Sequence, residues 1–132
     1  MYHPKTVEWD ERLKAMLDEV DHALEDRYGG HWRLRRNRPA RGETANPEAD
    51  GLFYVGAVFT PGFGSRLGRG YLIDLSLATD EELPDGKREE IEAYALALLR
   101  KLLPERFPER SLQVERDGRL YKIHGELGLG QA

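Results

Sequence analysis

Two apolar segments on either side of a glycine-rich loop constrain this chain most strongly. Residues 52–60, LFYVGAVFT, are apolar on both alternating faces, which is typical of a central strand covered on both sides. Residues 71–78, YLIDLSLA, alternate more cleanly and predict one buried face and one mixed face. The loop at 60–70 holds four glycines and a proline, which excludes regular structure there. Because sequential strands usually pair, we predict an antiparallel hairpin.

Two segments with helical periodicity flank this predicted hairpin. Residues 6–28 carry an apolar stripe and a charged outer face, and the glycine pair at 29–30 predicts where this helix ends. Residues 84–103 carry a wider apolar stripe, and Pro104 predicts the end of the second helix. Each helix therefore has one apolar face that must pack against another layer.

Three remaining segments complete the predicted element order. Residues 31–36, HWRLRR, alternate apolar and charged side chains and predict an edge strand. Residues 37–51 have no periodicity and are interpreted as a flexible surface loop. Residues 111–124 predict a hairpin, followed by a frayed tail at 125–132.

The turn of this last hairpin is assigned to Asp117-Gly118. Asp-Gly is a preferred dipeptide for a two-residue loop between antiparallel strands. This assignment pairs Val114 with Tyr121 across the hairpin. The predicted pairing sets one apolar face and one polar face for both strands.

Together these elements predict a single α+β domain over residues 1–132, in the order α-β-β-β-α-β-β. The expected architecture is a two-layer sandwich, a mainly antiparallel sheet of about five strands with two amphipathic helices on one face. The other sheet face then exposes Tyr54 and Val58. We therefore expect a homo-oligomer, with a dimer first, whose interface includes Tyr54, Val58 and Phe63. The alternative is that the helices cover opposite faces of the sheet.

Composition narrows the classes of function. The chain has no cysteine, which excludes disulfides and thiolate chemistry, and no apolar run long enough to span a bilayer. The N-terminus lacks a signal-peptide core, so we expect a cytoplasmic protein without a cofactor. Asp18, His22 and Asp26 share a helical face, but it is the polar face, and we predict no metal site.

Arginine is concentrated in the middle of the chain. Residues 27–70 carry eight arginines against three acids, although the whole chain has a net charge of −4. Arginines beside an aromatic side chain favour phosphate contacts and base stacking. The alternative is a solvated edge strand whose arginines pair with the acidic helices. The candidate residues for an anion or nucleic acid are Trp32, Arg33, Arg35, Arg36, Arg38, Arg66 and Arg69.

The glycine-rich loop at 60–70 supports a related hypothesis. Successive backbone N–H groups there can form an anion nest, and Arg66 and Arg69 would add charge. The loop lacks the Gly-Lys-Ser/Thr ending of a phosphate-binding P-loop, and a strand follows it instead of a helix. The alternative is a mobile hairpin loop with Phe63 at its tip.

One acid interrupts the second apolar strand. Asp74 on a half-buried sheet face would be suited to acid–base chemistry if His124 lay nearby. Ser76 lacks the Gly-x-Ser-x-Gly setting of a hydrolase nucleophile. Three hypotheses follow in order of support: a non-enzymatic binding or assembly module, phosphate or nucleic-acid binding through residues 27–41 with the loop at 60–70, and an acid–base enzyme.

Overall fold

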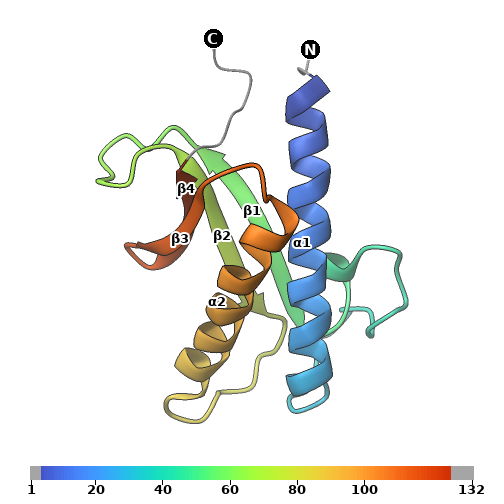
Figure 1. Cartoon of the computed structure of the whole chain (residues 1–132). Helices are drawn as coiled ribbons and strands as arrows, with labels where there is room; N and C mark the ends of the chain where they lie inside the picture. Colours follow the sequence, from blue (N-terminus) through green and yellow to red (C-terminus); the bar gives the residue numbers. More distant parts are fainter. Residues whose placement is uncertain (1–3, 126–132) are drawn as a thin grey trace.

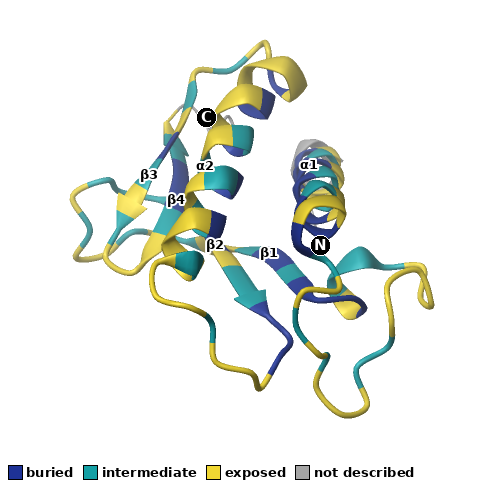
Figure 2. Ribbon diagram, turned by 90° about the horizontal axis from the view of Figure 1, so that it is seen from below, coloured by how far each residue is buried: buried dark blue, intermediate teal, exposed yellow. Residues whose placement is uncertain are grey.

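The fold is an α+β sandwich of two layers, as the sequence predicts. The computed structural model describes residues 4–125, with side chains from residue 8 onward. Both helices lie on one face of an antiparallel sheet (Figures 1 and 2), which rules out helices on opposite faces. The elements are α1 (Pro4–Tyr28), the 3-10 turn η1 (Pro47–Ala49), β1 (Phe53–Thr60), β2 (Gly70–Leu77), α2 (Lys87–Arg106), β3 (Leu112–Asp117) and β4 (Leu120–Gly125).

The sheet is built from two hairpins. Its strand order is β1-β2-β4-β3, and every neighbouring pair is antiparallel. β1 and β2 pair over their whole length, from Phe53 opposite Leu77 to Thr60 opposite Gly70. β2 and β4 pair over three residues of each strand only, centred on Leu72 opposite Lys122. The two hairpins therefore meet along a short seam.

The predicted strand at 31–36 does not form, so the sheet has four strands among the described residues instead of about five. Leu34 makes a single isolated bridge with Thr79, beyond the end of β2. Asn37 has a φ of +68°, which turns the chain away directly after this segment. As a consequence β1 is an edge strand, and the prediction that it is a central strand is wrong.

The second hairpin has the predicted strands in a different register. Asp117 pairs with Leu120, so the two-residue loop is Gly118-Arg119. Gly118 has a φ of +66° at the first loop position, which is where a type II′ turn requires glycine. Val114 consequently pairs with Ile123 instead of Tyr121. Because the shift is an even number of residues, each side chain keeps its predicted face.

One helix boundary is predicted correctly and the other is not. α1 ends at Tyr28, before the glycine pair, whereas α2 continues past Pro104 to Arg106. A proline in the last helical turn has a compatible φ and removes only one backbone donor. The continued turn places Phe107 in the core, where its ring lies 4.5 Å from that of Trp9 between centroids.

The core lies between the helices and the sheet. α1 places a stripe of fully buried side chains over β1, and α2 does the same over the other hairpin (Figure 2). No helix in residues 4–125 has the length and apolar content that a bilayer requires. The predicted tail lies outside the described residues except for Gly125, which ends β4. The principal core residues are Trp9, Met16, Val20, Leu24, Phe53, Val55, Ile91, Leu99, Phe107 and Ile123.

Candidate functional site

The face of the sheet that the helices do not cover exposes apolar side chains. Val58 on β1 has 63% of its surface exposed, and Phe63 at the tip of the glycine-rich loop has 93% exposed. Leu120 on β4 is 38% exposed on the same face. Tyr54 is half-buried because its ring lies across Gly56, where an added Cβ would be 2.5 Å from the Tyr54 hydroxyl oxygen. These side chains form a partly apolar surface, which we call the open face.

A buried lysine fixes the glycine-rich loop on this face. Lys122 is 1% exposed, and its Nζ donates to the carbonyl oxygen of Gly68 at 2.7 Å and to Ser65 Oγ at 3.0 Å. Nζ also pairs with Asp117 Oδ2 at 2.7 Å, and Ser65 Oγ donates to the same oxygen at 2.7 Å. The hydrogen bonds from Lys122 and Ser65 lower the pKa of Asp117. We call this group of four residues the lysine clasp.

The clasp is a structural arrangement, because every donor on the ammonium group has an acceptor. A buried charge of this kind is tolerated only when its hydrogen bonds are complete. The sequence contained one signal for it, the alternation of β4, which places Lys122 on the open face between Leu120 and His124. The partner Ser65 lies 57 residues earlier in the chain and was not predicted.

The backbone of the glycine-rich loop is engaged within the loop itself. The N–H groups of Ser65 and Gly68 donate to carbonyl oxygens at 3.0 and 3.3 Å, and that of Leu67 donates to Ser65 Oγ at 3.1 Å. Gly62 has a φ of +85°, and an added Cβ would lie 2.1 Å from the backbone of Gly68. These three N–H groups face acceptors within the loop and are not available to an anion, so the predicted anion nest is restricted to the other amides of the loop. A hollow of about 420 Å³ remains between the loop and the strands, with Phe63 and Leu120 on its rim.

Arg38 holds the preceding loop in place. Its guanidinium donates to the carbonyl oxygens of Glu48, Asp50, Gly51 and Phe53 at 2.9–3.0 Å. The Nε and Nη2 donors of this group are therefore occupied by the backbone and are not available to a phosphate. Residues 37–51, which the sequence led us to interpret as a loop without fixed contacts, are tied at this point to the start of β1.

Other arginines of the segment pair with acids or aromatic rings. Arg35 Nε lies 3.3 Å from Asp80, and Arg41 Nη2 lies 2.8 Å from Asp26. Arg27 stacks over Tyr94 at 4.9 Å from its ring centroid. The predicted alternative, in which the arginines pair with the acidic helices, therefore holds for Arg41, whose partner Asp26 lies on α1, but not for Arg35, whose partner Asp80 lies outside both helices.

Two arginines of the segment remain on a hollow at the protein surface. Arg33 and Arg36 line a space of about 360 Å³, together with Asp80 and Glu81. Neither guanidinium has an acid within 4.0 Å among residues 4–125. Trp32 lies beside them but is half-buried against the core, so its ring is only partly available for stacking.

The structure does not bring the arginine segment and the glycine-rich loop together. Arg33 and Arg36 lie near Thr79, at the end of β2, whereas Arg66 and Arg69 precede its first residue. An eight-residue strand spans about 25 Å at 3.3 Å per residue. The two segments are therefore not neighbours, and the arginines at 33–36 and those at 66–69 do not form one combined site in this structure.

Asp74 and His124 are also apart. The register of β2 with β4 places His124 beside Gly70, four residues along the strand from Asp74. His124 Nε2 instead lies 2.6 Å from Glu115 Oε2 on β3. Asp74 is exposed, so the two groups do not form an acid–base pair.

A buried acid on α1 was not predicted. Asp21 is 2% exposed, and its Oδ2 has no hydrogen-bond partner among the described residues. Burial, followed by the nearby carboxylates of Glu25, Asp18 and Asp50, raises the pKa of Asp21 to about 7. The helical spacing of the sequence places Asp21 next to the buried Val20, but the acid alone did not reveal its burial.

The neighbours of Asp21 have structural partners of their own. Glu25 accepts hydrogen bonds from the backbone N–H groups of Leu52 and Phe53. Asp50 accepts two hydrogen bonds from Thr44, at 2.8 and 2.9 Å. No group of acids or histidines within residues 4–125 has the arrangement of a metal site.

The fold and its open face define a small two-layer α+β protein with an uncovered sheet. A family model described as "Uncharacterised protein" matches residues 4–125, and the chain belongs to that family. A protein of Borreliella burgdorferi with the description "Uncharacterized protein" is 40% identical over 121 residues, which cover 92% of this chain and 94% of the relative. No solved structure matches this chain.

Proposed function

We propose that this chain is a non-enzymatic assembly module that forms a homodimer through the open face of its sheet. The exposure of Val58 and Phe63, 63% and 93%, is the observation that carries the proposal. The two helices cover the opposite face, so these side chains have no cover within residues 4–125. A two-fold axis lets one such patch pack against its own copy, with the sheets about 10 Å apart.

The lysine clasp supports this proposal because it holds the loop in a fixed position. Phe63 projects from a loop that Lys122 ties to the sheet through Ser65 and Gly68. A contact residue on a fixed loop loses less conformational entropy on association than one on a free loop. Phe63 and Val58 would then supply apolar contacts of the interface, and the exposed Asp74 lies beside them on β2, opposite Gly56.

Val58→Asp is expected to weaken dimerisation by about 30-fold or more, since a central contact is typically worth about 2 kcal/mol. The change places a charge at an apolar contact of the dimer, whereas in the monomer the new side chain is exposed to solvent. Static light scattering over a wide concentration range measures the dissociation constant. Gln113→Asp is the matched control, because it adds the same charge at an exposed position of β3 on the same sheet face. A native chain that keeps the mass of a monomer at every concentration contradicts the proposal.

Phosphate or nucleic-acid binding is the second candidate function. Arg33 and Arg36, which line one hollow and have no ion-pair partner among the described residues, are the observation that favours it. Arg38 does not line this hollow, and its Nε and Nη2 are bound to backbone carbonyl oxygens.

Arg33→Glu with Arg36→Glu is expected to abolish binding of a fluorescent single-stranded oligonucleotide, and the native affinity is expected to fall steeply with salt. Fluorescence anisotropy at several salt concentrations measures both effects. Arg66→Glu serves as the control, because this arginine lies at the other end of the strands. Binding that does not change with salt would eliminate this candidate.

A further inference from the structure

The free edge of the sheet presents unpaired backbone groups. The carbonyl oxygen of Leu52 accepts from the N–H of Ala78 at 2.7 Å, so even-numbered residues of β1 bond to β2. In an antiparallel ladder the intervening residues direct their N–H and C=O groups to the other side. Phe53 shows this directly, because its N–H donates to Glu25 and its C=O accepts from Arg38.

The backbone N–H and C=O groups of Ala57 and Phe59 are directed to the same outer side of the sheet. No described residue forms a hydrogen bond with them. Ala57 is half-buried and Phe59 is exposed. Natural edge strands are usually protected by lysine, proline or a bulge. β1 has none of these at 57–59, and its register with β2 is unbroken. Four backbone hydrogen bonds are therefore available at this edge.

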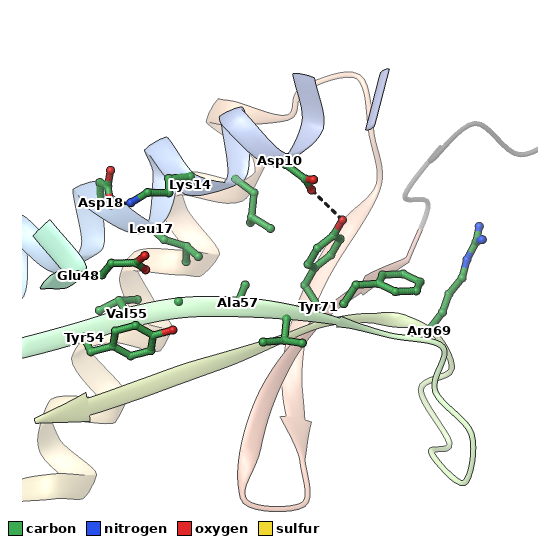
Figure 3. A pocket seen from close by; sticks show the side chains of 14 residues that line it. Asp10, Lys14, Leu17, Asp18, Glu48, Tyr54, Val55, Ala57, Arg69 and Tyr71 are labelled. Atoms are coloured by element: carbon green, nitrogen blue, oxygen red, sulfur yellow. Dashed lines mark hydrogen bonds and ion pairs between the residues drawn. The ribbon is translucent and has the colours of Figure 1, made fainter. Parts of the chain in front are cut away.

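A groove runs beside these groups, between α1 and β1 (Figure 3). It has a volume of about 740 Å³, within the range of sites that bind small or extended ligands. Leu13 and Leu17 of α1 form its apolar wall, and the small side chain of Ala57 keeps the space open. A strand added to β1 would place alternate side chains in this groove.

The wall also has a fixed polar group. Tyr71 donates its hydroxyl hydrogen to Asp10 Oδ1 at 3.1 Å across the groove. Burial, followed by the charge of Asp10, raises the pKa of Tyr71 to about 12, so the tyrosine stays a donor at neutral pH.

A second copy of this chain does not fit as the occupant. α1 lies over β1 (Figure 2), so a two-fold pairing of two β1 strands would place the two α1 helices one strand spacing apart. This spacing is about 4.8 Å, whereas packed helices need 8–10 Å between their axes. The occupant must therefore be a strand that has no helix packed on it. An extended peptide meets this requirement.

The charges at the two ends of the groove differ. Arg69 lies at the end near Phe59, and no acid lies within 4.0 Å of its guanidinium among residues 4–125. Glu48 lies at the other end, beside Tyr54, as Figure 3 shows. A peptide with an acidic side chain next to Phe59 would complement Arg69.

We propose that this groove binds an extended peptide of another protein, which pairs with Ala57 and Phe59 as an added edge strand. Its side chains would alternate between apolar groups in the groove and exposed groups, and an acidic side chain would pair with Arg69. Strand addition of this kind takes its affinity from backbone hydrogen bonds and its specificity from alternate side chains.

Random eight-residue peptides displayed on phage and selected against the full chain test this proposal. The enriched peptides are expected to share alternating apolar residues and one acid. A fluorescent synthetic copy is then titrated by anisotropy. Ala57→Pro is expected to weaken binding by about tenfold or more, because proline removes the outward N–H but no bond to β2. Ala57→Ser, which keeps the N–H and a small side chain, is the matched control.

Two further measurements keep the proposal falsifiable if Ala57→Pro does not fold. Arg69→Gln is expected to lower affinity several-fold and to reduce its salt dependence. Amide hydrogen exchange at Ala57 and Phe59 in the native chain is expected to slow when peptide is bound. The proposal is overturned if the bound peptide does not slow this exchange, or if the selection enriches no peptide. Phe63→Asp separates this site from the proposed dimer, since Phe63 belongs to the proposed dimer interface but does not line the groove, and the change should weaken self-association and leave peptide affinity unchanged.

Discussion

Asp21→Asn is expected to raise the free energy of unfolding at pH 8 by about 2–4 kcal/mol. Burial in the folded chain raises the pKa of Asp21 to about 7, from an ordinary value of 3.8. Between these values the folded state holds a proton that the unfolded state has released, so stability falls as the pH rises through this window. About three pKa units at 1.36 kcal/mol each set the upper limit of the effect. Asparagine keeps the shape of the side chain and removes the charge.

Urea unfolding at pH 4, 6 and 8 measures this effect. At pH 4 the native chain and Asp21→Asn should have similar stability, and their difference should grow toward pH 8. Asp26→Asn is the control, because Asp26 is an exposed acid of the same helix and should change stability by only about 0.5 kcal/mol at each pH. The same difference at all three pH values would show that Asp21 does not titrate in this window.

Lys122→Met is expected to lower the free energy of unfolding by about 3 kcal/mol. Methionine retains the apolar stem but leaves the carboxylate of Asp117 without its buried partner. Removing one member of a buried ion pair typically costs 3–5 kcal/mol, and Asp117 is partly exposed, so the lower value applies. The loop should also lose its fixed position, which faster amide exchange at Ser65 and Leu67 would report.

A double variant tests whether the pair acts as a unit. Lys122→Met with Asp117→Leu removes both charges and should be more stable than Lys122→Met alone. Lys101→Met, at an exposed position of α2, controls for the loss of a lysine. A loss of stability for Lys122→Met no larger than for Lys101→Met would mean that the clasp contributes little.

The fold was largely predictable because its signals are local. The helical stripe of residues 6–28, the alternation of 71–78 and the hairpin near Gly118 each depend on neighbouring side chains. The errors arose where distant segments compete. Residues 31–36 can extend the sheet only if the fold brings a strand edge next to them. The sequence around these residues does not contain that information.

The candidate site was less predictable because partners lie far apart along the chain. Val58 and Phe63 were identified as exposed apolar residues from alternation and from a glycine-rich loop, and their exposure agrees with this prediction. The arginines were identified by composition, which does not show that Arg38 binds four carbonyl oxygens. The lysine clasp joins Ser65 and Lys122, a pairing that only the folded chain brings about.

The short seam between β2 and β4 joins two hairpin units. α1 packs mainly on β1 and α2 mainly on β3 (Figure 1), and the two helices also pack against each other. Each hairpin is closed by contacts near in sequence, which carry little loop-closure entropy and form fast. The contacts across the seam can form only when both hairpin units are folded. The seam therefore fixes the position of one hairpin relative to the other and sets the cooperativity of the whole domain.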